Sequence, residues 1–345
     1  MKKFKIALVP GDGVGQEVID AARKVMEAVV QKGEVQFEFT EYMVGKIAYD
    51  KTKDPLPPET LDGIRRSDAT LMGAMSTGLV PPPSPMGRLR KELDLYADIR
   101  PIQSYPGVWC LKEKIDLIIV RENTQGFLAD RNLYKGYGEF MPDEDTVLSL
   151  RVLTRSGCER IARFAFEYAT KLSRKKITVA HKANVLRTGC GFFLEICKGV
   201  AKNYPTIEFR DEYVDSVANN LIGHPEGYDM ILTTNMFGDI ISDEAAALVS
   251  SLVPTANIGE GCVVFRPIHE AMLDIAGKNV VDPISTILSA MMMVEYLGGL
   301  QVAANIKRAV QKVLSEGLVR TRDLGGKSTT TEMTQAILDK LLKED

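Results

Sequence analysis

Charged and amide side chains follow several short apolar runs of this sequence, where strands are expected to end. Four runs show the pattern: Arg121 follows 115–120, Lys182 follows 177–180, Asp215 follows 207–213, and Asn235, Asp239 and Asp243 follow 228–233. In open α/β sheets, ligands bind beyond the carboxyl ends of the strands. These side chains are therefore predicted to contribute to one polar site.

Two of these carboxylates suggest a metal site. Asp239 and Asp243 are four residues apart where a helix is expected to begin, so they share one helix face. Paired carboxylates suit a hard divalent cation such as Mg²⁺ or Mn²⁺. The alternative is helix capping, in which Ser242-Asp243-Glu244 cap a helix from Ala245 onward, because acidic residues favour helix N-termini.

Arginines suggest that the ligand is anionic. Arg90 and Arg100 lie close in the sequence and, together with Arg121, could clamp carboxylates through bidentate hydrogen bonds. The alternative is a solvated helix face with salt bridges, and we favour that interpretation for Arg88 and Lys91.

The elements that must position these groups alternate along the chain. Strands are predicted over 4–9, 115–120, 177–180, 207–213 and 228–233, and helices over 17–30, 155–172, 185–200, 217–222, 244–253, 283–297, 302–316 and 331–342. This alternation predicts an α/β fold with a mostly parallel sheet. The stretches 76–87 and 126–142 are predicted to be long loops. The glycines of 11–15 lack the spacing of the dinucleotide-binding fingerprint, so a tight turn is expected there.

Composition excludes several classes of function. The 345 residues, 45% of them hydrophobic and 26% charged, are typical of a globular protein of about two domains. A net charge of −3 argues against bulk nucleic-acid binding. The uncharged stretch 69–87 contains four prolines and cannot be a membrane helix, and no signal peptide is evident. Five cysteines without a C-x-x-C pair indicate reduced thiols in a cytoplasmic protein, and three histidines argue against a multi-histidine metal site.

Taken together, the motifs resemble those of the β-decarboxylating dehydrogenases, the family of isocitrate, 3-isopropylmalate, homoisocitrate, tartrate and D-malate dehydrogenases. The motifs occur in the family's order along almost the whole chain: 10–15, 89–101, 121–124 (R-E-N-T), 181–185 (H-K-A-N-V), 213–215, 235–243 (N-M-F-G-D-I-I-S-D), 274–278 and 323–326.

The resemblance implies an isopropylmalate dehydrogenase-like two-domain α/β fold with a large, mostly parallel sheet that is not a Rossmann fold. One domain would comprise 1–96 and 250–345 on the cofactor side. The other, 97–249, would carry the substrate and metal residues and the interface of a homodimer or higher oligomer. The active site would be shared between subunits, with Lys182 and Asp215 reaching the partner's site.

The resemblance also implies roles for individual residues. Arg90, Arg100 and Arg121 match the arginines that bind the substrate carboxylates. Asp215, Asp239 and Asp243 match the ligands of Mg²⁺ or Mn²⁺, and Lys182 matches the base that takes the proton of the C2 hydroxyl.

For the cofactor, the resemblance points to NAD. His269 would contact adenine, and Asp274 matches the acid that binds the ribose hydroxyls in NAD-using members. NADP-using members often carry Lys-Tyr in place of Asp274-Ile275. A carboxylate at this position would repel a 2′-phosphate. Asp282 stands where Asn usually contacts adenine.

Other departures from the family concern the reaction and the substrate. Leu128 replaces a tyrosine thought to protonate the enolate carbon, and Tyr134 and Tyr137 are nearby candidates to replace it. Glu270 adds bulk and charge where the family has glycine. Ser84 lies six residues before Arg90, a spacing that resembles the serine of isocitrate dehydrogenases. The alternative is that Ser84 caps or turns the chain.

These observations predict a metal- and NAD-dependent oxidative decarboxylation of a D-malate-type 2-hydroxy acid, with 3-isopropylmalate or isocitrate as the first candidates. A non-catalytic regulatory subunit on the same fold is the main alternative, motivated by Leu128 and Glu270. A metal-dependent hydrolase would use the aspartates alone and would leave the arginines unexplained.

Overall fold

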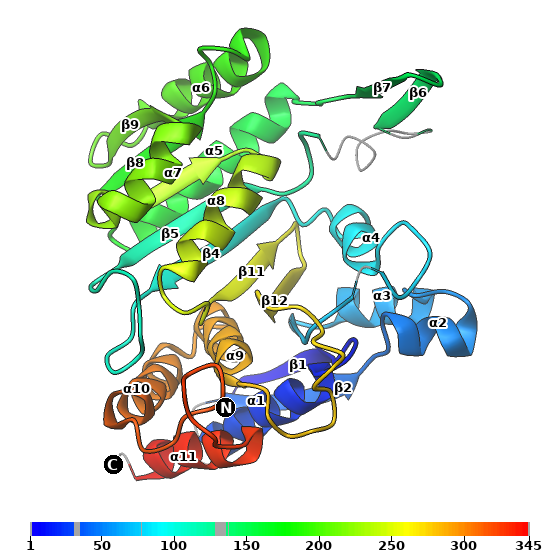
Figure 1. The fold of residues 1–345 in the computed structure, drawn as a ribbon, viewed down its shortest axis with the longest axis vertical. Coiled ribbons are helices and arrows are strands. Elements are labelled where there is room, and N and C mark those ends of the chain that lie inside the picture. Colours follow the sequence, from blue (N-terminus) through cyan, green and yellow to red (C-terminus); the bar gives the residue numbers. More distant parts are fainter. Residues whose placement is uncertain (1, 31–34, 77, 128–135, 137, 344–345) are drawn as a thin grey trace. The chain divides into compact units, whose positions relative to one another are not determined.

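The structure is a computed structural model that describes residues 2–30, 35–76, 78–127, 136 and 138–343. The chain divides into two compact units (Figure 1). The terminal unit comprises Met1–Leu89, Tyr105–Cys110 and Ser250–Asp345, and the central unit comprises Arg90–Ser104 and Leu111–Val249. Residues 90–96, expected with the terminal part, therefore belong to the central unit.

The strands of the terminal unit lie in the order β2-β1-β3-β12-β11. They are β1 (Lys2–Val9), β2 (Val35–Glu41), β3 (Ala69–Met72), β11 (Pro254–Ile258) and β12 (Val263–Pro267). β1 pairs parallel with β2 and β3, β12 pairs parallel with β3, and β11 and β12 form an antiparallel pair.

The helices of this unit are α1 (Gly15–Val30), α2 (Lys46–Thr52), α3 (Pro58–Arg66), α9 (Ile284–Tyr296), α10 (Leu300–Glu316) and α11 (Thr330–Leu342). α1, α3 and α9 pack on the strands, whereas α10 packs against α9, and α11 packs against α1 and α10. Every residue of α9 from Ile284 to Val294 is buried, because this helix packs against α1, α10 and the strands. α11 begins with a capping box between Thr329 and Glu332.

The central unit has the strand order β4-β5-β10-β8-β9. Its strands are β4 (Ala97–Gln103), β5 (Asp116–Glu122), β8 (Lys176–His181), β9 (Glu208–Tyr213) and β10 (Met230–Thr233). All neighbours pair parallel except β4 and β5, which are antiparallel. Buried β5 and β10 lie at the centre, as expected for strands that are covered on both faces.

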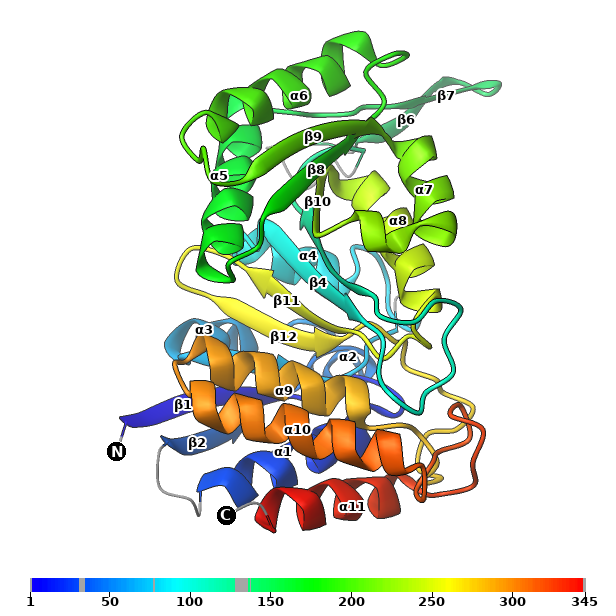
Figure 2. The ribbon, with the colours of Figure 1, turned by 90° about the vertical axis from the view of Figure 1, so that its left-hand side faces the viewer.

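Helices cover both faces of these strands. They are α5 (Arg155–Lys171), α6 (Arg187–Ala201), α7 (Val214–Gly223), η2 (Pro225–Gly227) and α8 (Asn235–Ala247). Figure 2 shows α5 and α6 on one side of the strands, and α7 and α8 on the other. α4 (Pro85–Glu92) crosses the boundary between the two units and carries Arg90.

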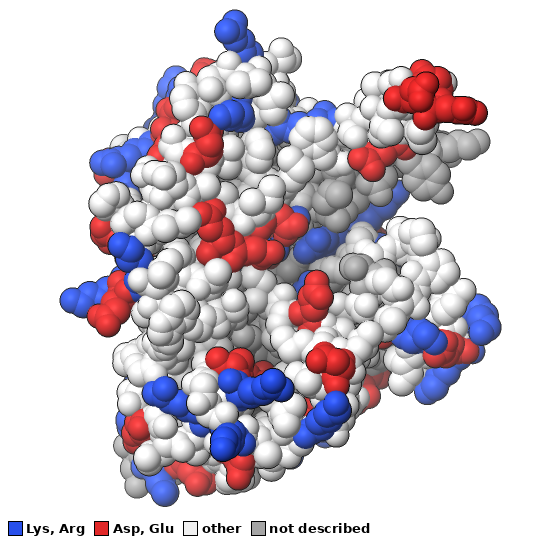
Figure 3. All heavy atoms as spheres, in the orientation of Figure 1, with Lys and Arg blue, Asp and Glu red and all other residues white. Residues whose placement is uncertain are grey.

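An antiparallel hairpin projects from the central unit. Its strands are β6 (Glu139–Asp143) and β7 (Thr146–Ser149), which pair with each other. Phe140, Met141, Val147 and Leu148 on the hairpin are exposed. Acidic side chains gather at its tip, where the sequence reads Asp143-Glu144-Asp145 (Figure 3).

The predicted α/β class is confirmed, but both ends of the helix predicted over 244–253 are wrong. The helix expected over 244–253 begins at Asn235 and ends at Ala247. Asp239 and Asp243 therefore lie inside α8, so the capping alternative is contradicted. The stretch 126–142, expected to be a loop, already enters β6 at Glu139.

No helix in the described part of the chain combines the length and apolar character that a membrane span requires.

Candidate active site

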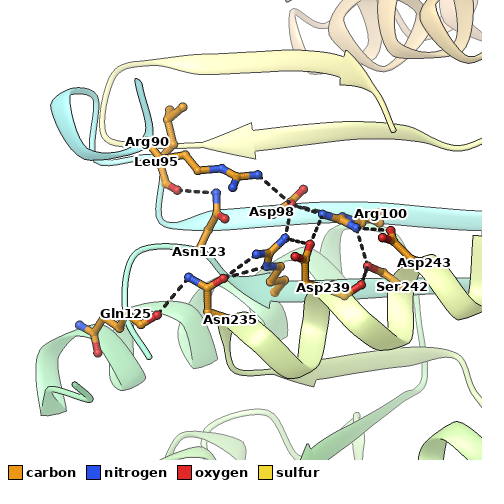
Figure 4. Close-up of polar contacts among 11 residues, drawn as sticks. Arg90, Leu95, Asp98, Arg100, Asn123, Gln125, Asn235, Asp239, Ser242 and Asp243 are labelled. Carbon is orange, nitrogen blue, oxygen red and sulfur yellow. Dashed lines mark hydrogen bonds and ion pairs between the residues drawn. The ribbon is translucent and has the colours of Figure 1, made fainter. Parts of the chain in front are cut away.

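Three arginines of the central unit converge on one buried carboxylate (Figure 4). Asp98 on β4 is only 1% exposed, and its Oδ2 lies 3.1 Å from Arg100 Nη2, 3.7 Å from Arg121 Nη1 and 3.8 Å from Arg90 Nη2. The antiparallel register pairs Asp98 with Arg121 on β5, and Arg100 follows Asp98 on the same side of β4. We call Asp98 and these three arginines the arginine cluster.

The cluster keeps its central carboxylate ionised. Burial opposes ionisation of Asp98, but Arg100, Arg121 and Arg90 together hold the pKa of this carboxyl below its ordinary value. The guanidinium groups of Arg100 and Arg121 are themselves buried. The sequence motifs point to the arginines but not to Asp98. Its place two residues before Arg100 on a strand was the signal that could have found it.

Helix α8 brings two further carboxylates to the cluster. Asp239 Oδ1 accepts from Arg100 Nη2 at 3.1 Å and from Arg121, and Asp243 Oδ1 accepts from Arg100 Nη1 at 3.0 Å. These side chains are 51% and 67% exposed, in contrast to Asp98. Partial burial, reinforced by Asp239 and opposed by Arg100, raises the pKa of Asp243. The two aspartates thus lie one helical turn apart, facing the arginines.

Hydrogen bonds between Arg121 and Asn235 hold the beginning of α8 against β5. Asn235 Oδ1 accepts from Arg121 Nε at 3.1 Å and from Nη2 at 2.6 Å, and Asn235 Nδ2 donates to the carbonyl oxygen of Gln125 at 3.0 Å. A Cβ at Gly238 would lie 2.7 Å from Arg121 Cγ, so only glycine allows α8 to approach so closely. The asparagine and glycine of the 235–243 motif therefore position its aspartates.

Lys182 and Asp215 form a second group within the central unit. Lys182 follows β8, Asp215 lies in the first turn of α7, and the Lys182 ammonium donates to Asp215 Oδ1. The hydrogen bond from Lys182 lowers the pKa of Asp215. Among the described residues, no three His, Cys, Asp or Glu side chains gather closely enough to hold a metal ion. The structure of this chain therefore does not bring Asp215 together with Asp239 and Asp243 as a metal site.

The predicted cofactor residues lie in the terminal unit, on the loop after β12. His269 Nδ1 lies 3.0 Å from the carbonyl oxygen of Glu270, and burial lowers the pKa of the imidazole. His269 Nε2 is buried and has no hydrogen-bond partner among the described residues. Asp274 and Glu270 are exposed, and Ile275 packs against the apolar cluster around Val281.

Asp282 ends this loop, and its Oδ2 atom is buried. Its Oδ1 accepts from the backbone N–H of Ile284 at 2.8 Å. Burial and the neighbouring Asp323 raise the pKa of Asp282 well above its ordinary value. This position favours the neutral carboxylic acid, which can donate a hydrogen bond as an asparagine amide does.

The glycine-rich turn after β1 supports the same loop. Val14 donates its backbone N–H to the carbonyl oxygen of Ala271 at 2.9 Å. A Cβ at Gly13 would lie only 1.9 Å from that oxygen, and Gly13 has a positive φ of 57°. The turn expected over 11–15 therefore packs directly against the loop that carries His269.

Ser84 has the geometry of a helix cap. Its Oγ accepts from the backbone N–H of Gly87 at 3.1 Å, immediately before α4. Leu128, Tyr134 and Tyr137 lie outside the described residues.

The comparisons identify the class of protein that this fold and arginine cluster define. Residues 5–337 match the isocitrate/isopropylmalate dehydrogenase family. The 3-isopropylmalate dehydrogenase of Archaeoglobus fulgidus is 42% identical over 339 residues, 98% of this chain and 99% of the relative. The isocitrate/homoisocitrate dehydrogenase of Thermus thermophilus is 40% identical over 98% of each chain. The structure of isocitrate dehydrogenase from Methylococcus capsulatus has a TM-score of 0.91 at 38% identity, covering 99% of this chain and 100% of that chain.

The chain therefore belongs to the isocitrate/isopropylmalate dehydrogenase family. Within this family, the relatives that the chain matches are dehydrogenases of 3-isopropylmalate, isocitrate and homoisocitrate. The family resemblance drawn from the sequence motifs is confirmed.

Proposed function

We propose that this protein catalyses the metal- and NAD-dependent oxidative decarboxylation of a D-malate-type 2-hydroxy acid, with 3-isopropylmalate or isocitrate as the first candidates. The observation that carries the proposal is the convergence of Arg90, Arg100 and Arg121 beside the carboxylates of α8. Buried guanidinium groups at hydrogen-bonding distance from carboxylates suit a polycarboxylate ligand, because they bind it bidentately.

The residues present fit a hard divalent cation. Asp239 and Asp243 offer only oxygen ligands, share one helix face and are exposed enough to turn toward a cation. Mg²⁺ or Mn²⁺ would be held by these two carboxylates and by Asp215 of a second subunit. When bound, the cation supplies positive charge that stabilises negative charge developing on the C2 oxygen of the substrate.

The loop after β12 fits the adenosine part of NAD. His269 Nε2 is a buried polar atom without a hydrogen-bond partner among the described residues, and it could bond to adenine. Asp274 is exposed, so it could accept hydrogen bonds from the ribose hydroxyls and disfavour a 2′-phosphate. Ile275 and Asp282 would complete this adenosine subsite.

The chain's own residues would then perform three tasks. The arginines would hold the substrate carboxylates, and Lys182 would take the proton from the C2 hydroxyl. NAD⁺, when bound, would supply the acceptor for the C2 hydride. The β-carboxylate then leaves as CO₂, and the enolate carbon takes up a proton. Since Leu128 cannot donate that proton, we assign this task to Tyr134.

We propose that the active form is a homodimer or a higher oligomer with shared sites. Exposed apolar side chains occur on α7 and α8, at Ile222, Met236 and Ile240, and on the β6–β7 hairpin. Such side chains are typical of surfaces that a second copy covers. The partner's Lys182 and Asp215 would thereby reach Asp239 and Asp243.

We also propose that the protein works in the cytoplasm. All five cysteines are free thiols, and Cys158, Cys190 and Cys197 are buried. Free thiols are typical of a reducing compartment.

The deciding experiment measures NADH and CO₂ together. The protein would be incubated with NAD⁺ and Mg²⁺ or Mn²⁺ and with D-malate, tartrate, isocitrate, homoisocitrate or 3-isopropylmalate. We expect NADH and CO₂ in equal amounts from one or two acids. NADH without CO₂ would mean that the step after oxidation is altered, and it would contradict the decarboxylating part of the proposed reaction. Inactivity toward every acid, with the protein folded, would contradict the proposed reaction.

Subunit complementation tests the shared site. Lys182→Met and Asp239→Asn would each be inactive alone. If Lys182 and Asp239 come from different subunits, a co-expressed mixture contains hybrid dimers with one intact site and regains part of the activity. If both residues serve the same subunit's site, the mixture stays inactive.

A regulatory subunit on the same fold is the second candidate. Glu270, exposed beside His269, favours it because a negative charge there opposes binding of a dinucleotide. This alternative predicts that the folded protein does not reduce NAD⁺ but binds tightly to a catalytic relative. Replacing Glu270 by Gly would then restore NAD binding, measured by calorimetry without substrate.

A further inference from the structure

Asp98 differs in its burial from the two carboxylates of α8 that also contact the arginines. Its side chain is 1% exposed, whereas Asp239 and Asp243 are 51% and 67% exposed. One Asp98 oxygen, Oδ2, faces all three guanidinium groups, and Oδ1 is buried with no hydrogen-bond partner among the described residues. A carboxylate in this position cannot turn out toward solvent or a cation.

Because Asp98 stays buried beside the arginines, it sets the net charge of the arginine cluster that a ligand meets. In the chain as it stands, the three arginines face the three carboxylates of Asp98, Asp239 and Asp243. If the two α8 carboxylates turn to a divalent cation, as the proposed function requires, only Asp98 remains with the arginines. Three positive charges and one fixed negative charge leave the cluster with two net positive charges.

We propose that Asp98 is a specificity-determining residue that limits the arginine cluster to two net positive charges, so that the site selects 2-hydroxy acids with two carboxylates over those with three. The inference rests on the proposed function and narrows its substrate class. A malate core with an uncharged side group matches the two charges. A third carboxylate would meet repulsion from Asp98 without an arginine left to balance it.

The physical reason is that Coulomb energy scales with the charge of the ligand. A buried negative charge weakens the binding of a trianion more than that of a dianion, and burial keeps salt from screening the difference. Specificity of this kind comes from a repulsive element built against the wrong ligand.

The substitution Asp98→Asn removes the negative charge of the side chain and preserves its shape. The amide oxygen can still accept from Arg100, and the amide nitrogen takes the place of Oδ1, which has no hydrogen-bond partner in the described part of the chain. The matched control is Asp116→Asn, at the start of β5. Asp116 pairs with Arg174 and lies five residues, roughly 17 Å along an extended strand, from Arg121.

The experiment measures dissociation constants by calorimetry with Mg²⁺ and without nucleotide, so that no turnover occurs. D-malate is the dianion and isocitrate the trianion. We expect Asp98→Asn to shift the ratio of the two dissociation constants toward isocitrate by about tenfold, an effect of the size that one charge produces in a partly screened site. Asp116→Asn should leave the ratio unchanged.

Each outcome supports or overturns the proposed role of Asp98 in specificity. An equal change for both acids, or an unchanged ratio in Asp98→Asn, would overturn it and leave Asp98 only a structural part of the cluster. If Asp98→Asn does not fold, Arg90→Gln provides the test, because removing a positive charge must shift the ratio toward D-malate. Failure of the folded wild-type chain to bind either acid would overturn the proposed function, and this inference with it.

Discussion

The arginine cluster of the central unit and the His269 loop of the terminal unit hold their polar groups in opposite ways. In the cluster, charged groups lie on β4, β5 and α8, and each compensates another at close range. On the loop, His269 and Asp282 are half-buried, each with one buried polar atom. The pKa shifts of both side chains favour their neutral forms, and both make few hydrogen bonds. The contrast shows that the cluster balances its charges through internal ion pairs, whereas the loop holds desolvated neutral groups. These properties suit the charged substrate and the neutral nucleobase that we propose for the two regions.

The largest expected effect concerns the base proposed for the central unit. Lys182→Met should lower kcat by about 10²- to 10⁴-fold, because a positioned acid–base group contributes that much. The exposed Lys171→Met at the end of α5 is the control and should keep full activity. NADH formation under saturating substrate measures the effect. Full activity of Lys182→Met would contradict the assigned base.

Arg121→Met should break the internal compensation of the cluster. It leaves Asn235 Oδ1 without its two guanidinium donors and removes one of the buried positive charges beside Asp98, so the free energy of unfolding should fall by about 3–5 kcal/mol. Urea unfolding measures this loss. Arg155→Met is a suitable control, because its salt bridge with Glu159 is exposed. A loss as small as that of the control would show that the cluster is not internally compensated.

The raised pKa of Asp282 on the loop predicts that the stability of the protein depends on pH. The pKa of Asp282 is raised in the folded chain, so the native state binds more protons than the unfolded state between the two pKa values. Stability is then lost as the pH rises from the unfolded pKa through the folded pKa. Asp282→Asn, which cannot ionise, should match the wild type near pH 4 and exceed it at pH 8 by about 0.5–3 kcal/mol.

Thermal unfolding of both proteins between pH 4 and pH 8 checks this prediction. Parallel stability curves for the wild type and Asp282→Asn would contradict the neutral form of Asp282. They would also remove the contrast between the loop and the cluster.

The smallest effect is expected at Ser84, which caps the helix that carries Arg90. Ser84→Ala should cost about 1 kcal/mol of stability, because the N–H of Gly87 loses its acceptor. The ratio of kcat/KM for isocitrate and 3-isopropylmalate should stay the same if Ser84 only caps. A changed ratio would instead support the specificity role suggested by its spacing from Arg90.

Much of the central unit was predictable because its patterns are local. The apolar runs before Arg121, Lys182 and Asp215 predicted β5, β8 and β9 closely. The beginning of α8 was not predictable in this way. Asn235–Asp243 carries polar groups that resemble a helix cap, but the packing of Gly238 and Asn235 against Arg121 extends the helix back to Asn235.

The sequence by itself determined the residue types and their order: three arginines, one lysine and three aspartates in the motifs of a dehydrogenase family. Only the tertiary structure decided which of these groups meet. The register of β4 against β5 places Asp98 opposite Arg121, and the close approach of α8 adds Asp239 and Asp243. The physical reason is that charge compensation depends on distances of a few ångströms between segments more than 100 residues apart, which no local pattern encodes.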